Sequence, residues 1–391
     1  MLVTARGDAQ LSKHLGPRVE EQKILSTEIL VAGGGPAGLA AAIAAAREGY
    51  SVTVADHAIP PIDKPCGEGI MPDGLAALEN LGVHLARDYA GAFRGIRFLG
   101  DGRQVEAQFV EGQGLGIRRT SLHRLLMERA AEEGVSMRWG ASVTLLGSQS
   151  AQVGNEAMRF RWLVCADGQN SRMRKAAGLD LVRVFGKRYG FRQHFRVRPW
   201  SDYVEVHWSD CGQLYITPTG QEELCVAFIT SRPDTRFSQV LREFPQVEQR
   251  LRGCEAMTRE QGSITSTARL RSVSRGRVAL LGEASGSIDA VTGEGLSTAF
   301  RQARVLVDAI KQDDLALYEK THRKIMRRPQ AMSRLLLLMD RTPAVRRRVL
   351  HALSADPAVF SRLLQIHTGA VSPVKLGIAG ALSFGWGFMT A

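Results

Sequence analysis

Three glycines follow a short apolar run in the pattern G-x-G-x-x-G: Gly33, Gly35 and Gly38. The apolar residues 29–32 are few enough to form a strand buried on both faces, and the alanine-rich residues 39–47 favour a helix. In such a unit the first glycine permits the tight turn, the second lets the backbone approach a pyrophosphate, and the third lets helix and strand pack closely. Free N–H groups at the start of the helix bind phosphate. The spacing therefore predicts a dinucleotide site.

A carboxylate stands where the other half of such a cofactor would lie. A second apolar strand over residues 51–55 ends in Asp56. This position is about 20 residues beyond the glycine turn, where an acidic side chain accepts hydrogen bonds from an adenosine ribose. The alternative is a strand, turn and helix without a ligand. That alternative does not account for three glycines clustered at the start of a good helix, so we prefer the dinucleotide site.

A second set of reactive side chains lies in the loop after this strand. Residues 57–74 contain four prolines and several glycines, which predicts a succession of turns without a regular strand. Within the loop, Cys66 and Glu68 place a thiol and a carboxylate among glycines, whose small size would let the backbone pass close to a flat ligand. The alternative is a surface turn in which the cysteine has no role.

The whole chain has an ordinary globular composition. Its 391 residues are 44% hydrophobic and 23% charged, enough for two intertwined lobes with large cores. Five widely spaced cysteines without a C-x-x-C pair argue against a disulfide framework or a metal site and favour a reducing cytoplasm. We expect no secretory signal and no membrane span, because the start of the chain is polar and no stretch is apolar for long enough. The net charge of +12 favours an anionic partner, but no motif supports nucleic acid.

The order of predicted elements indicates an α/β protein. Alternating residues predict a hairpin around Asp101-Gly102, and residues 187–231 contain several strand signals separated by turn residues, which favours an antiparallel sheet. We expect a Rossmann-type lobe interleaved with an antiparallel β-sheet lobe for the substrate, followed by a helical C-terminal region. The expected division is a leader at 1–26; a cofactor lobe in three parts, 27–92, 118–180 and 266–311; a substrate lobe in two parts, the hairpin at 93–117 and the sheet at 181–265; and C-terminal helices at 312–391.

Three further segments can be read together with the glycine unit. They are Arg119-Thr120-Ser121-Leu122 at a helix start, Asp167-Gly168 with the following residues to Arg174, and the glycine-rich run Gly282–Gly295. In this order the four segments resemble the flavoprotein hydroxylases of the p-hydroxybenzoate hydroxylase type and their relatives, the geranylgeranyl reductases. Together they span residues 27–310, so the resemblance covers most of the chain.

The resemblance implies that the cofactor is FAD. By this resemblance the turn residues that would face the pyrophosphate are Gly33, Gly35, Pro36, Ala37 and Gly38. Asp56 would contact the adenosine ribose, Arg119 would follow the diphosphate and ribityl chain, and Asp167 and Gly168 would lie near that chain. The residues expected at the ribityl group and the isoalloxazine ring are Gly282, Glu283, Gly293 and Gly295. NAD(P)H would be a transient reductant without a domain of its own, because the sequence has one dinucleotide fingerprint. No metal is expected.

Two residues depart from the family pattern. Glu283 stands where the family has aspartate, and its side chain is one methylene longer, so its contact with a ribityl hydroxyl must shift or pass through water. Ala290 stands where the family has proline, which we expect to loosen the turn before the flavin-facing glycines.

The expected catalytic residues are Cys66, Glu68 and Tyr215. Residues 64–69 are similar to the cysteine–glycine loop of the geranylgeranyl reductase branch, where a second glycine often stands at Glu68. Tyr215 and Pro218 are what this chain keeps of that branch's aromatic-x-x-proline motif. We expect Cys66 and Glu68 on the substrate side of the flavin. The Trp-x-Trp-x-Ile-Pro motif of flavin-dependent halogenases is absent from the sequence, which disfavours halogenation.

Other polar segments have plainer interpretations. His194 and His207 alternate with strand residues and favour satisfied sheet histidines over acid–base groups. The run of three arginines at 346–348 favours a solvated helix face. The segments 333–339 and 374–389 combine apolar residues with basic neighbours, which suits a peripheral membrane contact through the C-terminal helices or the mouth of a tunnel for a lipophilic substrate. Packing on the flavin lobe or on a partner subunit is the alternative, and the sequence leaves the oligomeric state open.

These observations lead to an FAD-dependent oxidoreductase, cytoplasmic or peripheral at the membrane surface, that acts on a lipophilic small molecule. The preferred reaction is monooxygenation, in which NAD(P)H reduces the flavin and O₂ supplies an oxygen atom to an aromatic or polyketide-like ring. Reduction of isolated double bonds in prenyl chains is the second possibility. A flavin-binding protein without turnover is the third, and the intact loop from Cys66 to Gly69 beside a complete flavin site argues against it.

Overall fold

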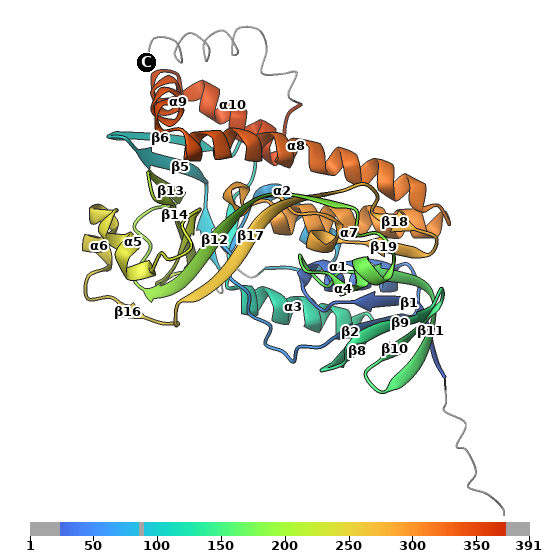
Figure 1. The fold of residues 1–391 in the computed structure, drawn as a ribbon. Coiled ribbons are helices and arrows are strands. Elements are labelled where there is room, and N and C mark those ends of the chain that lie inside the picture. Colours follow the sequence, from blue (N-terminus) through green and yellow to red (C-terminus); the bar gives the residue numbers. More distant parts are fainter. Residues whose placement is uncertain (1–23, 86–89, 373–391) are drawn as a thin grey trace, which may run out of the picture.

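A computed structural model describes residues 24–85 and 90–372. Two eight-stranded sheets and a three-stranded sheet form the framework, and helix α8 runs across the top of both lobes in Figure 1. The three-stranded sheet joins the loop containing Cys66 to the rest of the fold, because its first strand follows that loop directly. Its strands, in spatial order, are β3 (Gly69–Ile70), β7 (Gly114–Gly116) and β4 (Gly91–Phe93).

The first large sheet is the Rossmann-type sheet predicted from the glycine unit. Five of its strands, β19, β11, β1, β2 and β8, are parallel. Most apolar residues of the central strands β11, β1 and β2 are buried on both faces. Its strands are β18 (Ser274–Arg275), β19 (Val278–Leu280), β11 (Glu156–Cys165), β1 (Leu25–Ala32), β2 (Val52–Asp56), β8 (Ser136–Trp139), and the added pair β10 (Ser150–Val153) and β9 (Val143–Gly147). The first strand starts at Leu25, inside the segment that the sequence assigned to the leader.

The second large sheet is the predicted antiparallel sheet, except that β13 and β5 pair in parallel. Its strands are β16 (Glu255–Ala256), β12 (Val182–Arg196), β15 (Glu223–Thr230), β14 (Gly212–Gly220), β13 (Val204–Ser209), β5 (Gly95–Gly100) and β6 (Arg103–Gln108), with β17 (Gln261–Leu270) paired to β12. The predicted hairpin is formed by β5 and β6. Strand β17 is continuous across the predicted boundary between residues 265 and 266, so one long strand belongs to both proposed segments.

The helices cover the sheets and close the region between the lobes (Figure 1). They are α1 (Pro36–Arg47), α2 (Pro72–Asn80), α3 (Arg119–Glu132), α4 (Arg172–Ala176), α5 (Phe237–Arg242), α6 (Pro245–Leu251), α7 (Gly295–Lys311), α8 (Leu315–Arg341), α9 (Pro343–Ala355) and α10 (Pro357–Thr368), with the short 3₁₀ turns η2 (Gly282–Ser285) and η3 (Ala290–Thr292). Helix α1 packs against both α3 and α7, and α8 packs against α7 and α9. In the described ranges, no helix combines the length and the apolar character needed to cross a bilayer.

The interpretation of the arginine run as a solvated helix face was wrong for its first residue. Arg346 on α9 is 3% exposed. Its guanidinium lies 2.8 Å from Asp101 and 2.6 Å from Asp210, and it also donates to the carbonyl of Ser209. The pairing joins α9 to two turns of the second sheet, and a one-dimensional charge pattern could not reveal it because both partners are more than a hundred residues away in sequence.

We predict that Arg346→Leu lowers the free energy of unfolding by about 2 kcal/mol or more, because it removes the buried partner of two carboxylates. Arg347→Leu is the control. Arg347 is exposed on the same helix, and surface changes of this kind stay within about 0.5 kcal/mol. Chemical denaturation of the FAD-loaded variants measures both values, and equal stability of the two variants would show that the Arg346 pairs contribute nothing.

Candidate cofactor and substrate site

One cavity of about 410 Å³ lies where the two lobes and the C-terminal helices meet. Its lining includes backbone of the turns that follow β1, β11 and β19, together with the loop containing Cys66. These three strands are parallel neighbours in the first sheet, so their carboxyl ends share one edge. The rest of the lining comes from the second sheet and from α8, α9 and α10.

The three glycines after β1 have different surroundings. Gly33 has φ +112°, and a Cβ there would lie 2.4 Å from a carbonyl oxygen of the turn after β11. A Cβ on Gly38 would lie 1.9 Å from the carbonyl oxygen of Gly33, so both positions must be glycine for the chain to pack. Gly35 instead lines the cavity with Pro36 and Ala37, and no atom lies within 4 Å of its Cβ position. The open side of this turn is therefore available to a ligand.

Asp56 ends β2 and holds the glycine turn in shape. One carboxylate oxygen accepts from the backbone N–H of Gly34 at 2.7 Å, and the other accepts from that of Ala58 at 2.8 Å. The residue lies beyond the lining of the cavity. Its contact with an adenosine ribose stays a prediction.

Of the residues Arg119, Asp167 and Gly168, the first and the last line the cavity. Arg119, at the start of α3, lines the cavity, and within the described chain its buried Nε has no hydrogen-bond partner. Gly168 also lines the cavity, with φ +84°. Asp167 is not among the lining residues, and its carboxylate accepts from the hydroxyl of Ser171 at 2.5 Å and the N–H of Met173 at 3.1 Å. It braces the turn that presents Gly168.

The segment from Gly282 to Gly295 faces the cavity with its backbone. Gly282 and Glu283 line it from η2, and a Cβ on Gly293 or Gly295 would meet no atom within 4 Å. Helix α7 begins at Gly295, so free N–H groups of its first turn lie at the cavity wall and favour a negative charge. The side chain of Glu294 points into the protein, and burial raises its pKa.

The turn before these glycines is held by a buried carboxylate. Asp289 is buried and accepts from the N–H of Val291 at 3.0 Å. Its carboxylate also pairs with the buried guanidinium of Arg188 on β12, again at 3.0 Å. An ion pair from the second sheet thus holds this turn, and the looser turn expected from Ala290 stays a prediction.

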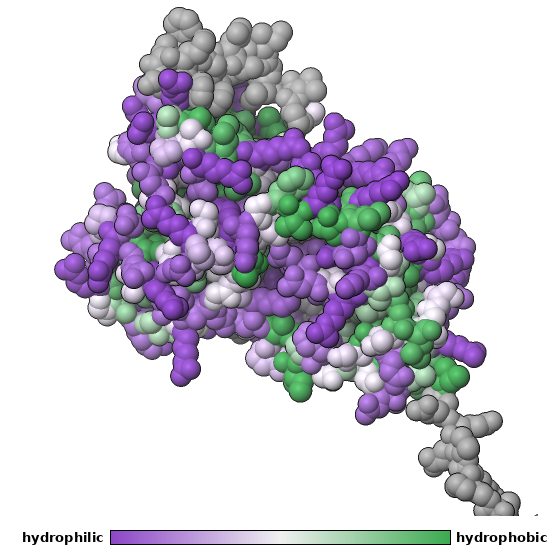
Figure 2. Space-filling view, in the orientation of Figure 1, coloured by the Kyte–Doolittle hydropathy of each residue, from purple (hydrophilic) through white to green (hydrophobic). Residues whose placement is uncertain are grey.

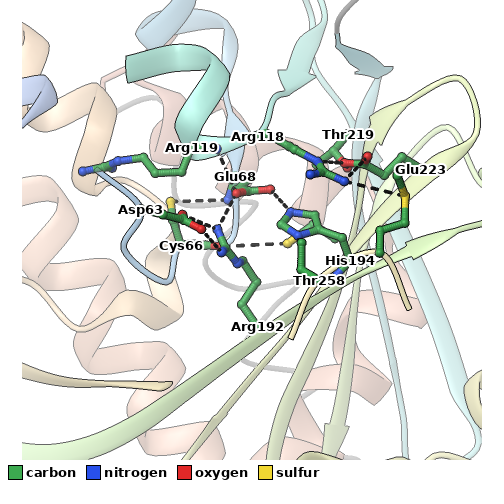
Figure 3. A network of polar contacts seen from close by, with 12 residues as sticks. Asp63, Cys66, Glu68, Arg118, Arg119, Arg192, His194, Thr219, Glu223 and Thr258 are labelled. Atoms are coloured by element: carbon green, nitrogen blue, oxygen red, sulfur yellow. Dashed lines mark hydrogen bonds and ion pairs between the residues drawn. The ribbon is translucent and has the colours of Figure 1, made fainter. Parts of the chain in front are cut away.

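Glu68 lies at the centre of a buried polar network (Figure 3). Its backbone has φ +60°, which is unusual for a residue other than glycine, and its side chain is fully buried. One carboxylate oxygen accepts from the N–H of Arg119 at 2.8 Å and from Arg192 at 2.7 Å, and the other lies 2.6 Å from Nε2 of His194. Arg192 also pairs with Asp63 at 2.8 Å. Burial opposes the charge of Arg192, but the hydrogen bond to Asp63 and the charge of Glu68 raise its pKa.

The partners of His194 favour one arrangement of its protons. The hydroxyl of Thr258 accepts from the backbone N–H of His194 at 3.0 Å and lies 3.2 Å from its Nδ1. A hydroxyl that accepts from the backbone and donates to Nδ1 leaves the imidazole proton on Nε2, facing Glu68. The expectation of a satisfied sheet histidine is therefore confirmed, but the partner belongs to the loop that contains Cys66.

The cavity edge fits FAD on three structural features. Gly35, Gly293 and Gly295 leave open space where side chains would otherwise stand. Arg119 brings a cation with an unpaired buried N–H, and α7 brings the positive end of a long helix. Open backbone for a flat, extended ligand together with groups that favour phosphate matches a flavin dinucleotide.

Comparison with known families agrees with this geometry. A family described as FAD binding domain matches residues 26–313. The chain belongs to this family. The match includes the glycine unit, Arg119, the Asp-Gly turn and the Gly282–Gly295 segment, so the protein is an FAD-dependent oxidoreductase.

Several relatives can be aligned with most of the length of this FAD-binding protein. The menaquinone reductase of Mycobacterium tuberculosis is 27% identical over 324 residues, which cover 74% of this chain and 78% of the relative. A Rhodococcus erythropolis protein named "Probable 2-heptyl-3-hydroxy-4(1H)-quinolone synthase AqdB2" is 29% identical over 313 residues, 73% of this chain and 79% of its own. A solved flavoprotein/dehydrogenase from Cytophaga hutchinsonii has a TM-score of 0.77 at 17% identity and covers 90% of this chain and 94% of its own. That structure supports the fold class.

The three residues predicted to be catalytic in this FAD-dependent protein all line the cavity. Burial raises the pKa of the Cys66 thiol, although the charge of Arg119 acts in the opposite direction. Burial also raises the pKa of Tyr215, whose hydroxyl donates to the carbonyl of Val291 at 3.1 Å. The side chains of Cys66 and Tyr215 are therefore neutral at pH 7 and form part of the cavity wall. Both carboxylate oxygens of Glu68 have hydrogen-bond partners.

Sequence reasoning missed Arg192 as a site residue and assigned His194 no role there. A signal was present: Arg188, Arg192 and His194 are separated by even numbers along one strand, so they share a face. Three large polar side chains on the buried face of a strand require partners. The sequence did not show that those partners were Asp289 and Glu68.

We predict that Gly35→Val gives a folded but colourless protein. Gly35 has φ −71° and no neighbour within 4 Å of its Cβ position, so valine fits the backbone and would obstruct only the bound cofactor. The FAD absorbance per protein measures the loss, and Gly35→Ala, with a smaller obstruction, should retain more. Full FAD content in the valine variant would contradict the placement of the pyrophosphate.

Proposed function

We propose that this FAD-dependent oxidoreductase hydroxylates a lipophilic molecule with an aromatic or polyketide-like ring, using NAD(P)H as reductant and O₂ as oxygen source. The observation that carries the proposal is the lining of the cavity of about 410 Å³. Open glycine backbone lines one part of it, and apolar side chains line the other. Such a cavity can hold a flavin and an apolar substrate in contact while excluding water.

The apolar part of the cavity is built by all three C-terminal helices and the second sheet. Contributions come from Leu336 and Met339 on α8, Leu353 on α9, and Phe360 and Leu364 on α10. These five residues are buried and belong to one apolar cluster with β6 and β13. Because these walls offer no hydrogen bonds, they favour an alkyl or ring substrate over a polar one.

The residues of the chain would position the reactants rather than form bonds with them. Bound FAD would accept a hydride from NAD(P)H and, once reduced, supply electrons to O₂. The hydrogen bond of Tyr215 to Val291 fixes the tyrosine ring as a wall. Glu68 would hold the loop that carries Cys66, because its carboxylate oxygens are occupied by three donors. Direct proton transfer by Glu68 is thereby disfavoured.

A second candidate is reduction of a carbon–carbon double bond in a prenyl chain. It is supported by Cys66 at the cavity wall, in a loop that is similar to the cysteine–glycine loop of the geranylgeranyl reductases. A further support is the relative named menaquinone reductase, since its name describes a reductase of a lipophilic molecule. The apolar walls would accommodate either substrate.

Product analysis distinguishes the two reactions. FAD-loaded protein is incubated with NADPH and a panel of alkylphenols, an alkylquinolone and prenyl lipids, with isotope-labelled O₂ and without O₂. Hydroxylation predicts a product that carries the label and forms only with O₂. Two added hydrogens in the anaerobic sample would replace the proposal with the reductase.

We predict that Cys66→Ser keeps its FAD but lowers turnover, or the product formed per NADPH, by roughly tenfold, because a displaced wall alters the alignment of substrate and flavin. Glu68→Gln should have a larger effect, since it leaves Arg192 with one charged partner in place of two. Cys254→Ser is the matched control, outside the cavity lining. If both site variants kept wild-type turnover and wild-type product per NADPH, the loop would be a surface turn without a role in the reaction.

A further inference from the structure

An exposed apolar strip lies on the long β12–β17 pair. Val184 and Phe185, neighbours in sequence, are 62% and 49% exposed, and Ile264 on β17 is 50% exposed. Neighbours in a strand normally point to opposite faces. Here the register of β12 against β17 shifts between Phe185 and Arg188, with Gly186 at φ +64°. Residues 183–187 are all exposed, so both faces of the strand pair reach solvent at this point, and Val184 and Phe185 are both exposed although they precede the shift. Arg188, beyond the shift, is buried.

The end of helix α8 flanks this strip. Leu338 is 49% exposed, and Arg334 and Arg341 lie on the same helix face, four residues before it and three after. A Cβ on Gly186 would lie 3.4 Å from a guanidinium nitrogen of Arg341, which places the helix beside the bulge. Figure 2 shows an apolar area where β12 and β17 pass below α8, with hydrophilic side chains around it.

The margin of the strip is cationic. Arg183 and Lys187 are exposed on β12, on either side of the segment at Gly186 that lies beside Arg341 of α8. Strands β12 and β17 contain no acidic residue. In the last turns of α8 the one acid is Asp340, which is 11% exposed and pairs with Arg188 at 3.1 Å. An apolar centre with a cationic margin and no exposed acid is complementary to anionic lipid headgroups above acyl chains.

The strip is continuous with the cavity. Ile264 is half exposed and also lines the cavity. On α8, Met332 and Leu335 line the cavity, and Leu335 lies one turn before the exposed Leu338. A lipophilic molecule could therefore move from the strip to the apolar walls without leaving apolar surface.

We propose that the protein docks on an anionic phospholipid surface through this rim, and that its substrate enters from the bilayer. The docking rim consists of the apolar Val184, Phe185, Ile264 and Leu338 with the cations Arg183, Lys187, Arg334 and Arg341. The inference rests on the proposed function for the lipophilic character of the substrate. Arg334 and Leu338 of the rim belong to the segment 333–339 that the sequence suggested for membrane contact, and β12 and β17 add surface that the sequence did not indicate. Residues 374–389, the other segment suggested, lie outside the described residues.

Co-sedimentation of the FAD-loaded full chain with vesicles tests the rim. Vesicles of phosphatidylglycerol and phosphatidylcholine should bind the protein, and pure phosphatidylcholine vesicles should bind it far less. Arg334→Glu with Arg341→Glu should lower binding to the anionic vesicles at least about tenfold, and added salt should reduce wild-type binding. Arg242→Glu with Arg252→Glu is the matched control: it makes the same change in net charge near α5 and α6, far from the rim in Figure 1, and should change binding less than about twofold.

A second pair of variants separates the apolar contribution. Phe185→Ser with Leu338→Ser keeps the charges and should also weaken binding to anionic vesicles by at least about tenfold, because it removes the side chains that would enter the acyl region. FAD absorbance and the unfolding midpoint check that each variant is folded.

Three results would overturn the proposal: no wild-type binding to anionic vesicles, equal losses in the rim and control variants, or a stable dimer that buries the rim and does not bind vesicles. The last result would assign the rim to a second copy of the chain. Vesicle binding needs no turnover, so failure of the hydroxylation assay leaves this test intact, and failure of docking leaves the reaction undecided.

Discussion

The buried carboxylate of Glu68 is the constraint on which the organisation of the site depends. A charge removed from water is tolerated only when its partners are complete, and this carboxylate receives donors from the start of α3 and from two side chains of β12. The backbone at Glu68 has φ +60°, a conformation that glycine adopts without strain. Glutamate at this position therefore holds a less favourable backbone conformation, and its carboxylate completes the polar network. The network joins the cysteine-containing loop to both lobes.

Strand β12 extends this coupling along the cavity. Its inward face carries Arg188, which holds the turn before Gly293 through Asp289, and then Arg192 and His194, which hold Glu68. The second sheet thus supplies ion pairs that shape the backbone of the cavity wall. Because each pair is buried, movement of the second sheet relative to the first would leave charges unpaired, and this penalty keeps the two lobes in register.

The C-terminal helices complete the site from the other side. Helix α8 packs on α7 and contributes apolar side chains to the cavity, while its last turns lie beside the bulge of β12. Arg346 of α9 anchors this layer to the second sheet by pairing with Asp101 and Asp210. The apolar walls therefore depend on polar anchors outside the cavity, which position the helices without placing charge near the substrate.

The sequence by itself determined the local backbone features. The glycine turn, the parallel strands, the Asp-Gly turn and the glycines before α7 were predictable, because each depends on residues close together in the chain and on conformations that few side chains permit. The tertiary structure alone decided that Asp167 braces its turn, that Arg188 pairs with Asp289, that Arg346 is buried, and that Arg192 and His194 meet Glu68 across more than 120 residues of sequence. Such pairs leave no periodic trace in the chain, because packing of one sheet edge against a distant loop selects the partners. The proposed docking rim depends on tertiary structure in the same way, since it requires the β12 segment at Gly186 and the end of α8 to lie side by side.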